Sequence, residues 1–374
     1  MNRKSSIRVS AYVKGDADTP DYYRIHQYLN SIGGLNVNYH LMLPARLYHK
    51  YVPIREHHIL IVVVLFLFVY IRTVLALAKD VLMPPDVLVV NRRIMPNRAF
   101  FPVWPLLSLI GRNGRTTIIW DFDDDIVRLG ECSEHDFQKM SVCAAHIIVT
   151  HEHLASLVDA SCQSKIIILP TTDGDMYRIV QKEQMKTERL QTLKDNVILV
   201  WVATSLNLPF LESAIGQLDQ AAETVSNQKG KTLILKVVCN APLKHQCRHL
   251  KVENIKWTRD VAIESMCKAH IGIMPLLNTE IAHGKGGFKL VQYLSVGLPC
   301  IATDIGYNHK VVNASCGQLI PPDSPGFWTE AIMRLSDKDT WLRSSECAFR
   351  TWEENFSFEK NLAVWEHLLY GKNI

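Results

Sequence analysis

The chain has 374 residues, of which 48% are hydrophobic and 21% are charged, and its formal net charge is +4. This length exceeds what one ordinary hydrophobic core requires, and the composition excludes a disordered protein. The small net charge gives no support for nucleic-acid binding, although it is compatible with anionic substrates and with membrane surfaces.

The cysteines and the first residues indicate a compartment. Nine cysteines occur without a Cys-x-x-Cys pair, and the first six residues lack the apolar core of an export signal. An odd number of cysteines in this context is typical of a reducing environment. We therefore expect a cytoplasmic protein.

Short β-rich runs alternate with longer helical stretches along the whole chain, and the pattern starts again at Val197. Such alternation is typical of parallel sheets covered by helices. Two successive units of this kind predict an α/β protein with two doubly wound sheets, with ligands at the carboxyl ends of the strands. A charged stretch at 182–194 is interpreted as a solvent-facing connector. The predicted strands are 7–13, 35–41, 86–91, 116–120, 146–150 and 165–169, then 197–202, 232–238, 255–257, 271–275, 299–302 and 317–320.

Residues 59–78 form an apolar run that is interrupted chiefly by Arg72. The run is close to the ~20 residues that a membrane-spanning helix requires. Three interpretations remain: a buried helix of the first domain, a helix docked in the plane of a membrane surface, and a true span, which the strand signals on both sides disfavour. A basic and histidine-rich flank that suits anionic headgroups precedes the run, at Arg46, His49, Lys50, Arg55, His57 and His58.

A glycine-rich segment, Gly284-Lys285-Gly286-Gly287, links a predicted strand to a predicted helix that begins at Phe288. Glycines let backbone N–H groups approach a ligand closely, and the helix N-terminus adds partial positive charge. Lys285 and Lys289 supply full charges against a diphosphate. The alternative is an ordinary turn with exposed lysines.

Residues 284–299, with the sequence GKGGFKLVQYLSVGLP, resemble the donor-binding signature of glycosyltransferase family four, and in particular its bacterial polysaccharide branch. The resemblance implies the GT-B fold, with two Rossmann-like domains that face a central cleft, a nucleotide-sugar as co-substrate, no metal requirement and retention of anomeric configuration. The better-known family pattern has two glutamates, where this chain has Gly284 and Gln292. Gln292 is then left to bind a ribose hydroxyl, and Glu280 or His283 to contact the donor sugar.

Three other segments support the resemblance: 200–207 (VWVATSLN), 120–125 (WDFDDD) and 168–173 (ILPTTD) with Tyr177. It implies that Thr204 and Ser205 bind phosphate.

The aspartate cluster after the fourth predicted strand has several interpretations. Asp123 or Asp124 orients the acceptor hydroxyl or accepts its proton, with Asp121 and Arg24 as further acceptor contacts. The alternatives are a solvated turn that caps the next helix and, with less support, an Asp-x-Asp metal site. Arg24 alternatively caps surface structure.

The resemblance also implies how the chain is divided into domains and what each domain binds. We expect an acceptor-binding domain at 1–193, a nucleotide-sugar-binding domain at 194–345, and a C-terminal helix at 346–374 that crosses back to the first domain. The expected reaction transfers a sugar to a lipid-linked saccharide in cell-surface polysaccharide synthesis, at the inner face of the cell membrane, with 59–78 touching the membrane. A non-catalytic binding module and a nucleotide-sugar isomerase remain alternatives. The expected donor-binding residues are Thr204, Ser205, Gly284, Lys285, Gly286, Gly287, Phe288, Lys289 and Gln292.

Overall fold

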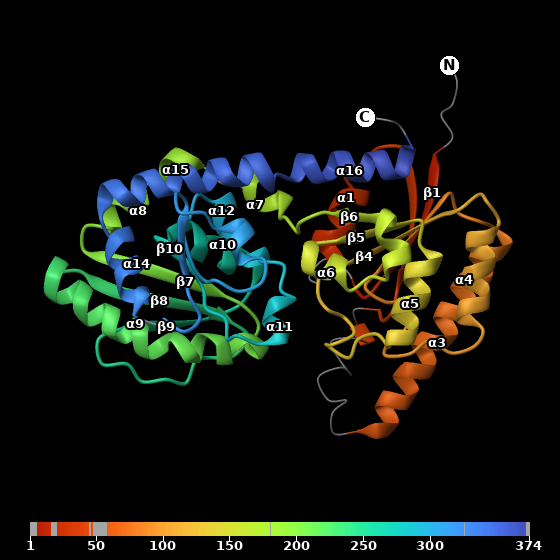
Figure 1. The fold of residues 1–374 in the computed structure, drawn as a ribbon, viewed down its shortest axis with the longest axis horizontal. Coiled ribbons are helices and arrows are strands. Elements are labelled where there is room, and N and C mark those ends of the chain that lie inside the picture. Colours follow the sequence, from red (N-terminus) through yellow and green to blue (C-terminus); the bar gives the residue numbers. More distant parts are fainter. Residues whose placement is uncertain are drawn as a thin grey trace, which may run out of the picture. The chain divides into compact units, whose positions relative to one another are not determined.

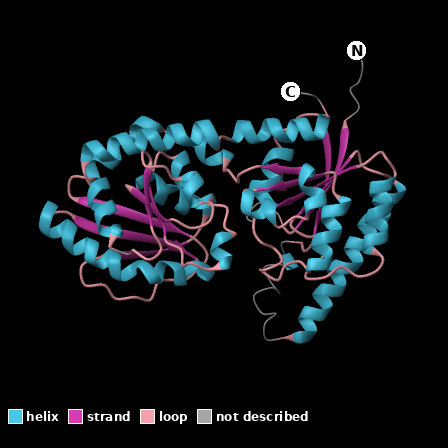
Figure 2. Cartoon of the chain, in the orientation of Figure 1, coloured by secondary structure: helices cyan, strands magenta, loops and turns pink. Residues whose placement is uncertain are grey.

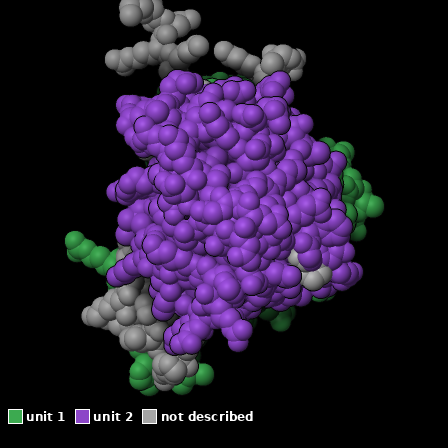
Figure 3. Space-filling view, turned by 90° about the vertical axis from the view of Figure 1, so that its left-hand side faces the viewer, with its two compact units in different colours: residues 1–171, 359–374 green, residues 172–358 purple. Residues whose placement is uncertain are grey.

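The computed structural model describes residues 6–15, 21–44, 46–47, 58–179, 181–324 and 326–371. The chain forms two compact units, one of Met1–Thr171 with Glu359–Ile374 and one of Thr172–Phe358 (Figure 3). In each unit, helices pack against a parallel sheet (Figures 1 and 2). The α/β fold class expected from the sequence is confirmed.

The first unit contains a six-stranded sheet with the order β2-β1-β3-β4-β5-β6. Every described pair in it is parallel, and β1 lies between β2 and β3. The predicted strands 7–13 and 35–41 are confirmed residue for residue. The strands are β1 (Ile7–Val13), β2 (Leu35–Leu41), β3 (Val87–Asn91), β4 (Thr117–Phe122), β5 (His146–Val149) and β6 (Ile166–Ile168).

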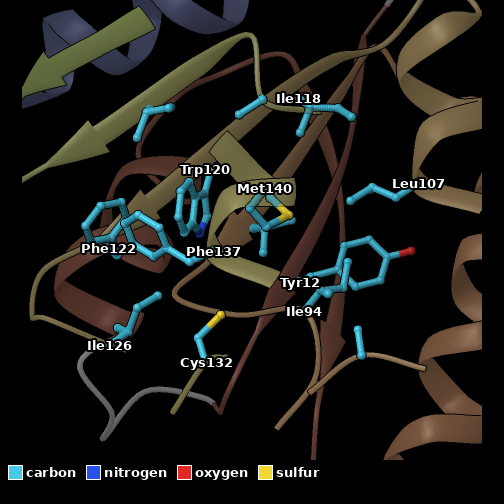
Figure 4. Packing of buried hydrophobic residues seen from close by; sticks show 14 of the residues in the cluster. Tyr12, Ile94, Leu107, Ile118, Trp120, Phe122, Ile126, Cys132, Phe137 and Met140 are labelled. Carbon is cyan, nitrogen blue, oxygen red and sulfur yellow. The ribbon is translucent and has the colours of Figure 1, made fainter. Parts of the chain in front are cut away.

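An aromatic group forms the centre of one core layer of this unit (Figure 4). The Trp120 ring lies 4.6 Å from that of Phe122 and 4.9 Å from that of Phe137 on α5 (Glu134–Cys143). Alternation along β4 puts Trp120 and Phe122 on one face of the sheet and Asp121 on the other. Each of these fully buried aromatic side chains contributes roughly 3 kcal/mol of transfer free energy, so β4 is a rigid support for the residues that follow it.

The apolar run forms a single helix, α3 (Ile59–Leu82), which ends just before Pro84 and Pro85 because proline cannot continue a helix. It is long and apolar enough to cross a membrane by length and composition. Its buried residues are Val69, Thr73, Leu77 and Asp80, so the first ten residues, 59–68, contain none. The interpretation as a buried core helix is therefore wrong for 59–68, which we call the first half. Of the predicted flank, His49, Lys50, Arg55 and His57 lie outside the described residues.

The helices of the first unit come from its N-terminal stretch and from the C-terminal end of the chain. They include the turn η1 (Tyr22–His26) that continues as α1 (Gln27–Leu29), then α3, α4 (Val103–Arg112), α5, α6 (Glu152–Ser156), η3 (Ala160–Lys165) and most of α16 (Phe358–Tyr370).

The second unit contains a six-stranded parallel sheet with the order β12-β11-β10-β7-β8-β9. Counted within the unit, this is the dinucleotide-binding order 3-2-1-4-5-6, and the order reverses between β7 and β10. The strands are β7 (Asn196–Val202), β8 (Thr232–Cys239), β9 (Lys251–Lys256), β10 (Ile271–Met274), β11 (Cys300–Thr303) and β12 (Gly317–Ile320).

The predicted strand 255–257 is misplaced, since β9 begins at Lys251. This edge strand carries Lys251, Glu253 and Lys256 and alternates between half-buried and exposed residues. Charges on an edge discourage pairing with other chains, and they also hide the apolar pattern that marks inner strands.

The predicted connector 182–194 is instead a helix, α8 (Lys182–Thr192), that packs within the second unit. Its Arg189 is buried and donates to the carbonyl oxygens of Met266 and Cys267, both at 2.8 Å, and to that of Val296 at 2.9 Å. Burial lowers the pKa of Arg189 to about 10. These bonds satisfy carbonyl groups at two helix ends. The second unit begins at Thr172 and includes α8, so the division between the units lies earlier than the expected residue 193.

The two C-terminal helices carry buried tryptophans. On α15 (Lys338–Asn355), Trp341 is buried and donates its indole N–H to the carbonyl oxygen of His270 at 2.8 Å. On α16, Trp365 is buried 6.0 Å from the ring of Tyr28 in the first unit. The other helices of the second unit are α7 (Gly174–Ile179), η4 (Ser205–Asn207), α9 (Leu208–Lys229), α10 (Arg259–Lys268), α11 (Glu280–His283), α12 (Phe288–Ser295), α13 (Asn308–Val311) and α14 (Phe327–Leu335).

Candidate active site

The strand order of the second unit indicates where a ligand binds. Ligands of open α/β sheets bind beyond the carboxyl ends of the strands, at the point where the strand order reverses. In this unit that point lies between β7 and β10. The segment 203–207 follows β7, and the loop 275–287 follows β10. The structure therefore brings the two predicted donor-binding segments to adjacent strand ends.

Gly287 ends the glycine-rich loop and starts α12. Its φ of +65° lies in the left-handed region, and a Cβ there would meet Cγ2 of Val311 at 3.2 Å. Backbone conformation and space both favour glycine. The loop thus places Gly284, Lys285, Gly286 and Gly287 directly before Phe288, at the positive end of α12.

Lys289 and Gln292 belong to a polar network inside the second unit. The ammonium of Lys289 donates to Oε1 of Gln292 at 3.1 Å, and Nε2 of Gln292 donates to Oδ2 of Asp173 at 3.0 Å. The guanidinium of Arg259 donates to Oδ1 of Asp173, also at 3.0 Å. Gln292 thereby links the cation on α12 to the carboxylate before α7.

The electrostatics of this network weaken the charge on Lys289. Burial lowers the pKa of Lys289 to about 8, although the carboxylate of Asp173 opposes this and Arg259 adds to it. Arg259 also donates to Oδ2 of Asp175 at 3.1 Å, so two cations and two carboxylates make up the network. A diphosphate would restore the ordinary protonation of Lys289.

Thr204 and Ser205 lie after β7, as expected, and already have local partners. The N–H of Ser205 donates to Oδ1 of Asn240 at 2.7 Å, and Nδ2 of Asn240 donates to the Ser205 hydroxyl at 3.1 Å. The side chain of Asn207 donates to Oγ1 of Thr204 at 3.1 Å. Asn240 also lines a pocket of about 260 Å³ at the ends of β8 and β9, together with Cys239, Ala241, Pro242, Asn254, Ile255 and Lys256.

Glu280 and His283 lie on the short helix α11, within the loop after β10. Thr279 caps this helix by accepting from the N–H of Ala282 at 3.3 Å. Nε2 of His283 lies 2.9 Å from Oδ1 of Asn278, and Glu280 is exposed. Lys285 lies close by in sequence, with its ammonium 5.6 Å from the centre of the Phe210 ring.

The strand order of the first unit reverses between β1 and β3. Lys14 follows β1, Arg92 follows β3, and Asp123 follows β4. Arg92 has a φ of 58°, an uncommon value for a residue with a side chain. Such outliers concentrate at functional positions.

Arg92 binds three carboxylates at once. Its Nη1 lies 3.1 Å from Oδ1 of Asp123, its Nη2 donates to Oδ2 of Asp124 at 2.8 Å, and its Nε lies 3.2 Å from Oε2 of Glu131. Burial opposes the charge on Arg92, but the three carboxylates outweigh it and raise its pKa. Burial lowers the pKa of the neighbouring Lys14. Asp123 and Asp124 therefore face a guanidinium, and no group of three or more His, Cys, Asp or Glu side chains is placed to hold a metal ion among the described residues.

Arg24 and Asp121 form an enclosed ion pair. Nε of Arg24 lies 3.1 Å from both carboxylate oxygens of Asp121, and its Nη1 donates to the carbonyl oxygen of Leu169 at 2.6 Å. Arg24 is 2% exposed and Asp121 is fully buried. Asp121 lies inside β4, which runs further than the predicted 116–120. The geometry gives both residues a structural role, tying η1 to β4, rather than the expected contact with an acceptor.

Residues 200–338 match the family model described as "Glycosyl transferases group 1". The second unit therefore contains a group 1 glycosyltransferase domain. No curated protein sequence matches the chain. The family expected from the glycine-rich signature is confirmed.

Solved structures similar to this glycosyltransferase cover almost the whole chain. A UDP-forming α,α-trehalose-phosphate synthase from Burkholderia xenovorans, in complex with glucose-6-phosphate, has a TM-score of 0.63 at 11% identity and covers 97% of this chain and 100% of its own. HepE of Anabaena, in complex with UDP-glucose, has a TM-score of 0.60 at 12% identity, with 97% and 100% covered. A sucrose-phosphate synthase from Thermosynechococcus elongatus has 0.58 at 11% identity, with 98% of each chain covered. The GT-B fold is confirmed.

Several polar residues that follow strands were missed by sequence reasoning. Arg92 and Arg93 follow β3 in this glycosyltransferase, and Arg93 lies 3.2 Å from Glu131. Arg259 and Asn240 follow β9 and β8. The one sequence signal for them was their position directly after a strand. The side chain of Tyr177, quoted for the resemblance, lies outside the described residues.

Proposed function

We propose that this glycosyltransferase moves a sugar from a nucleotide-sugar donor to a saccharide acceptor on a lipid carrier, in the assembly of a cell-surface polysaccharide. The observation that carries the proposal is the network of Lys289, Gln292, Asp173 and Arg259 beside the glycine-rich loop, at the strand-order reversal of the second unit. The structural relatives are described as UDP-forming or as bound to UDP-glucose, which supports a nucleoside diphosphate donor.

The donor diphosphate is held by Lys285, Lys289 and the backbone of Gly284–Gly287, with Thr204 and Ser205 on the neighbouring loop. These groups stabilise the negative charge that develops as the nucleotide leaves, and such stabilisation usually accounts for most of the rate enhancement in this kind of reaction. Because the cations belong to the chain, the reaction does not require a metal. Glu280 and His283 contact the donor sugar. By the family resemblance, the transfer retains anomeric configuration.

The acceptor hydroxyl is oriented by Asp123 or Asp124, and the same carboxylate accepts its proton. Arg92 is the positioning residue for both, because its guanidinium binds both carboxylates. Arg24 and Asp121 act indirectly, by fixing the strand that carries this pair.

The enzyme works in the cytoplasm, at the inner face of the cell membrane, where a lipid-linked acceptor is reached. Residues 59–78 supply the contact with the membrane, because the first half of α3 presents apolar side chains to the outside.

The proposal is tested by measuring free nucleotide, by mass spectrometry, after incubation of the detergent-purified protein with a panel of nucleotide-sugars. Each donor is tested with and without a membrane lipid extract, and with a chelator to remove divalent metals. We expect release from one donor, stimulated by the extract and insensitive to the chelator, and lost in a Lys285→Ala/Lys289→Ala variant. The exposed Lys194→Ala serves as the matched control.

Two other outcomes would overturn the proposal. Donor binding without release, with or without extract, would indicate a non-catalytic binding module. Conversion of the donor into an isomeric nucleotide-sugar in the absence of acceptor would indicate an isomerase.

A further inference from the structure

The first half of α3 carries an apolar surface that the unit around it leaves uncovered. Leu60 is 76% exposed and Val64 is 63% exposed, and Ile59 is exposed to a similar degree. The consecutive residues Val62, Val63 and Val64 are all exposed. Because successive residues of a helix are turned by 100°, side chains of this segment point outward on more than half of its circumference. A partner helix would cover one seam only, whereas lipid covers all sides.

The second half of α3 has two distinct faces. One face is buried through Val69, Thr73, Leu77 and Asp80. The opposite face is an exposed stripe of Ile71, Leu75 and Leu82, which continues the line of Leu60, Val64 and Leu67 in the first half.

The exposed charges of α3 are positive. The helix contains three charged residues, of which Arg72 and Lys79 are exposed and Asp80 is buried. Long basic side chains beside an apolar stripe extend their charge toward lipid headgroups while their stems lie along the acyl region. This arrangement suits an anionic bilayer surface.

Two phenylalanines before α4 extend the same surface. The Phe100 ring packs edge-on against that of Phe66, with centroids 5.8 Å apart. The hydroxyl of Tyr70 donates to the carbonyl oxygen of Phe101, whose side chain is 81% exposed. Aromatic side chains are enriched at the level of the headgroups. The apolar surface is therefore bordered by aromatic and basic side chains at the level of Tyr70 and Arg72.

A span is excluded by the connections of the helix. β2 precedes α3 and β3 follows it, and both strands pair with β1 in one sheet. The two ends of α3 must therefore lie on the same side of any membrane, whereas one spanning helix has its ends on opposite sides. The segment that precedes the helix contains Arg46, Lys50 and Arg55 and is too polar to cross back.

We propose that the first half of α3 inserts into one leaflet of a lipid bilayer without crossing it. Residues 59–68 span about 15 Å at ~1.5 Å per residue, about half of the ~30 Å hydrocarbon core. Arg72 and the Phe101 side chain then lie at the headgroups, and the buried half of the helix holds the first unit against the surface. This inference deepens the membrane contact proposed above and does not depend on the donor or on turnover.

Binding is tested by flotation with vesicles of phosphatidylglycerol and phosphatidylcholine. Val64→Glu introduces a charge into the inserted half, and Val142→Glu is a matched control on α5 of the same unit, since Val142 is 67% exposed. We expect Val64→Glu to lose most of its vesicle binding and Val142→Glu to keep it. Equal binding of both variants would overturn the proposal.

Depth is tested with nitroxide labels on Leu60→Cys, Ile71→Cys and Leu82→Cys, and the labelled unsubstituted chain gives the background from the native cysteines. Insertion into one leaflet puts position 60 deepest, position 71 near the headgroups and position 82 in water. A span would put position 71 deepest, and a helix lying flat would give equal depths; either result would overturn the proposal.

Two controls separate this inference from neighbouring ones. A concentration-dependent dimer that Val64→Glu dissociates, in a protein without vesicle binding, would assign the surface to a second copy of the chain and overturn insertion. Nucleotide release measured in detergent tests the transferase activity alone. An unsubstituted protein that releases nucleotide but does not bind vesicles would therefore refute the membrane proposal and leave the transferase proposal standing.

Discussion

The carboxylate of Asp80 accepts a hydrogen bond from the hydroxyl of Tyr12 at 2.7 Å, and this contact joins α3 to the strand β1. Asp80 also accepts from the Ser10 hydroxyl at 2.9 Å, and all three side chains are buried. The strand residues Ser10 and Tyr12 lie on the same face of β1. The pair therefore fixes the rotation of α3 about its axis, which determines which side of the helix faces outward.

Removal of the Asp80 carboxylate should weaken the attachment of α3 to β1. We expect Asp80→Ala to lower the free energy of unfolding by about 2–3 kcal/mol, because two buried hydroxyls lose a charged acceptor, and Tyr12→Phe to lower it by about 1–2 kcal/mol. Urea unfolding of both single variants and the double variant gives the coupling between them. Additive losses would mean that the two side chains do not interact.

Arg92→Met should reduce sugar transfer by about a hundredfold or more, because Asp123 and Asp124 lose the group that positions them. Donor affinity should stay within about twofold, since the donor network lies in the other unit. The readout is kcat compared with the donor KM, with the exposed Arg115→Met as control.

Arg92→Lys distinguishes positioning from folding. Arg92→Met should lower the free energy of unfolding by about 3–5 kcal/mol, because it leaves a cluster of carboxylates without its cation. Lysine restores one positive charge, so Arg92→Lys should recover part of this loss. It cannot reach three carboxylates at once, so transfer should stay low. Full recovery of transfer in Arg92→Lys would show that charge alone is required.

Donor affinity should depend on pH through Lys289. Its pKa is about 8, so the ammonium is present below that value and is lost above it. The donor Kd should therefore rise by roughly tenfold between about pH 7 and about pH 9. Lys289→Arg should remove this dependence, because arginine stays charged. Calorimetric titration at both pH values provides the measurement, and an unchanged Kd in the unsubstituted protein would contradict the assignment.

The lowered pKa of Lys289 affects the free energy of unfolding in the opposite direction to donor binding. The pKa of Lys289 in the folded protein is below the ordinary lysine value, so the unfolded chain binds more protons between the two values. This group by itself makes the free energy of unfolding rise with pH in that window.

Arg189→Met should lower the free energy of unfolding of the second unit by about 3–5 kcal/mol, because the carbonyl oxygens of Met266, Cys267 and Val296 lose a buried charged donor. Arg343→Met, an exposed change on α15, should alter it by less than about 0.5 kcal/mol. Thermal unfolding followed by tryptophan fluorescence makes the comparison. Similar midpoints for the two variants would show that the carbonyl oxygens find other partners.

The fold was predictable because local patterns mark inner strands and helix starts. The strands at 7–13 and 35–41 and the helix start at Phe288 follow from apolar runs and from glycine placement. The edge strand β9 was misplaced because its charges hide that pattern. Arg189 lies on a helix that looks solvent-facing, and its acceptors are far away in sequence.

Candidate site residues could be predicted where a motif is continuous in sequence. The glycine-rich loop and Lys289 were predicted in this way. Arg92 was missed because its importance follows from the strand order β2-β1-β3, a long-range arrangement that no local pattern encodes. Arg24 and Asp121 were expected to contact the acceptor because sequence position near a strand end does not reveal burial.

The place of α3 in the chain has a consequence for biosynthesis. The helix is made after β2 and before β3, and β1 can pair with β3 only once α3 has left the ribosome. The apolar helix is therefore exposed for a time without the completed sheet that holds its inner face. Chains at this stage are prone to aggregate. Synthesis close to a bilayer would give the helix its partner before the protein has finished folding, and expression without membranes should favour insoluble material.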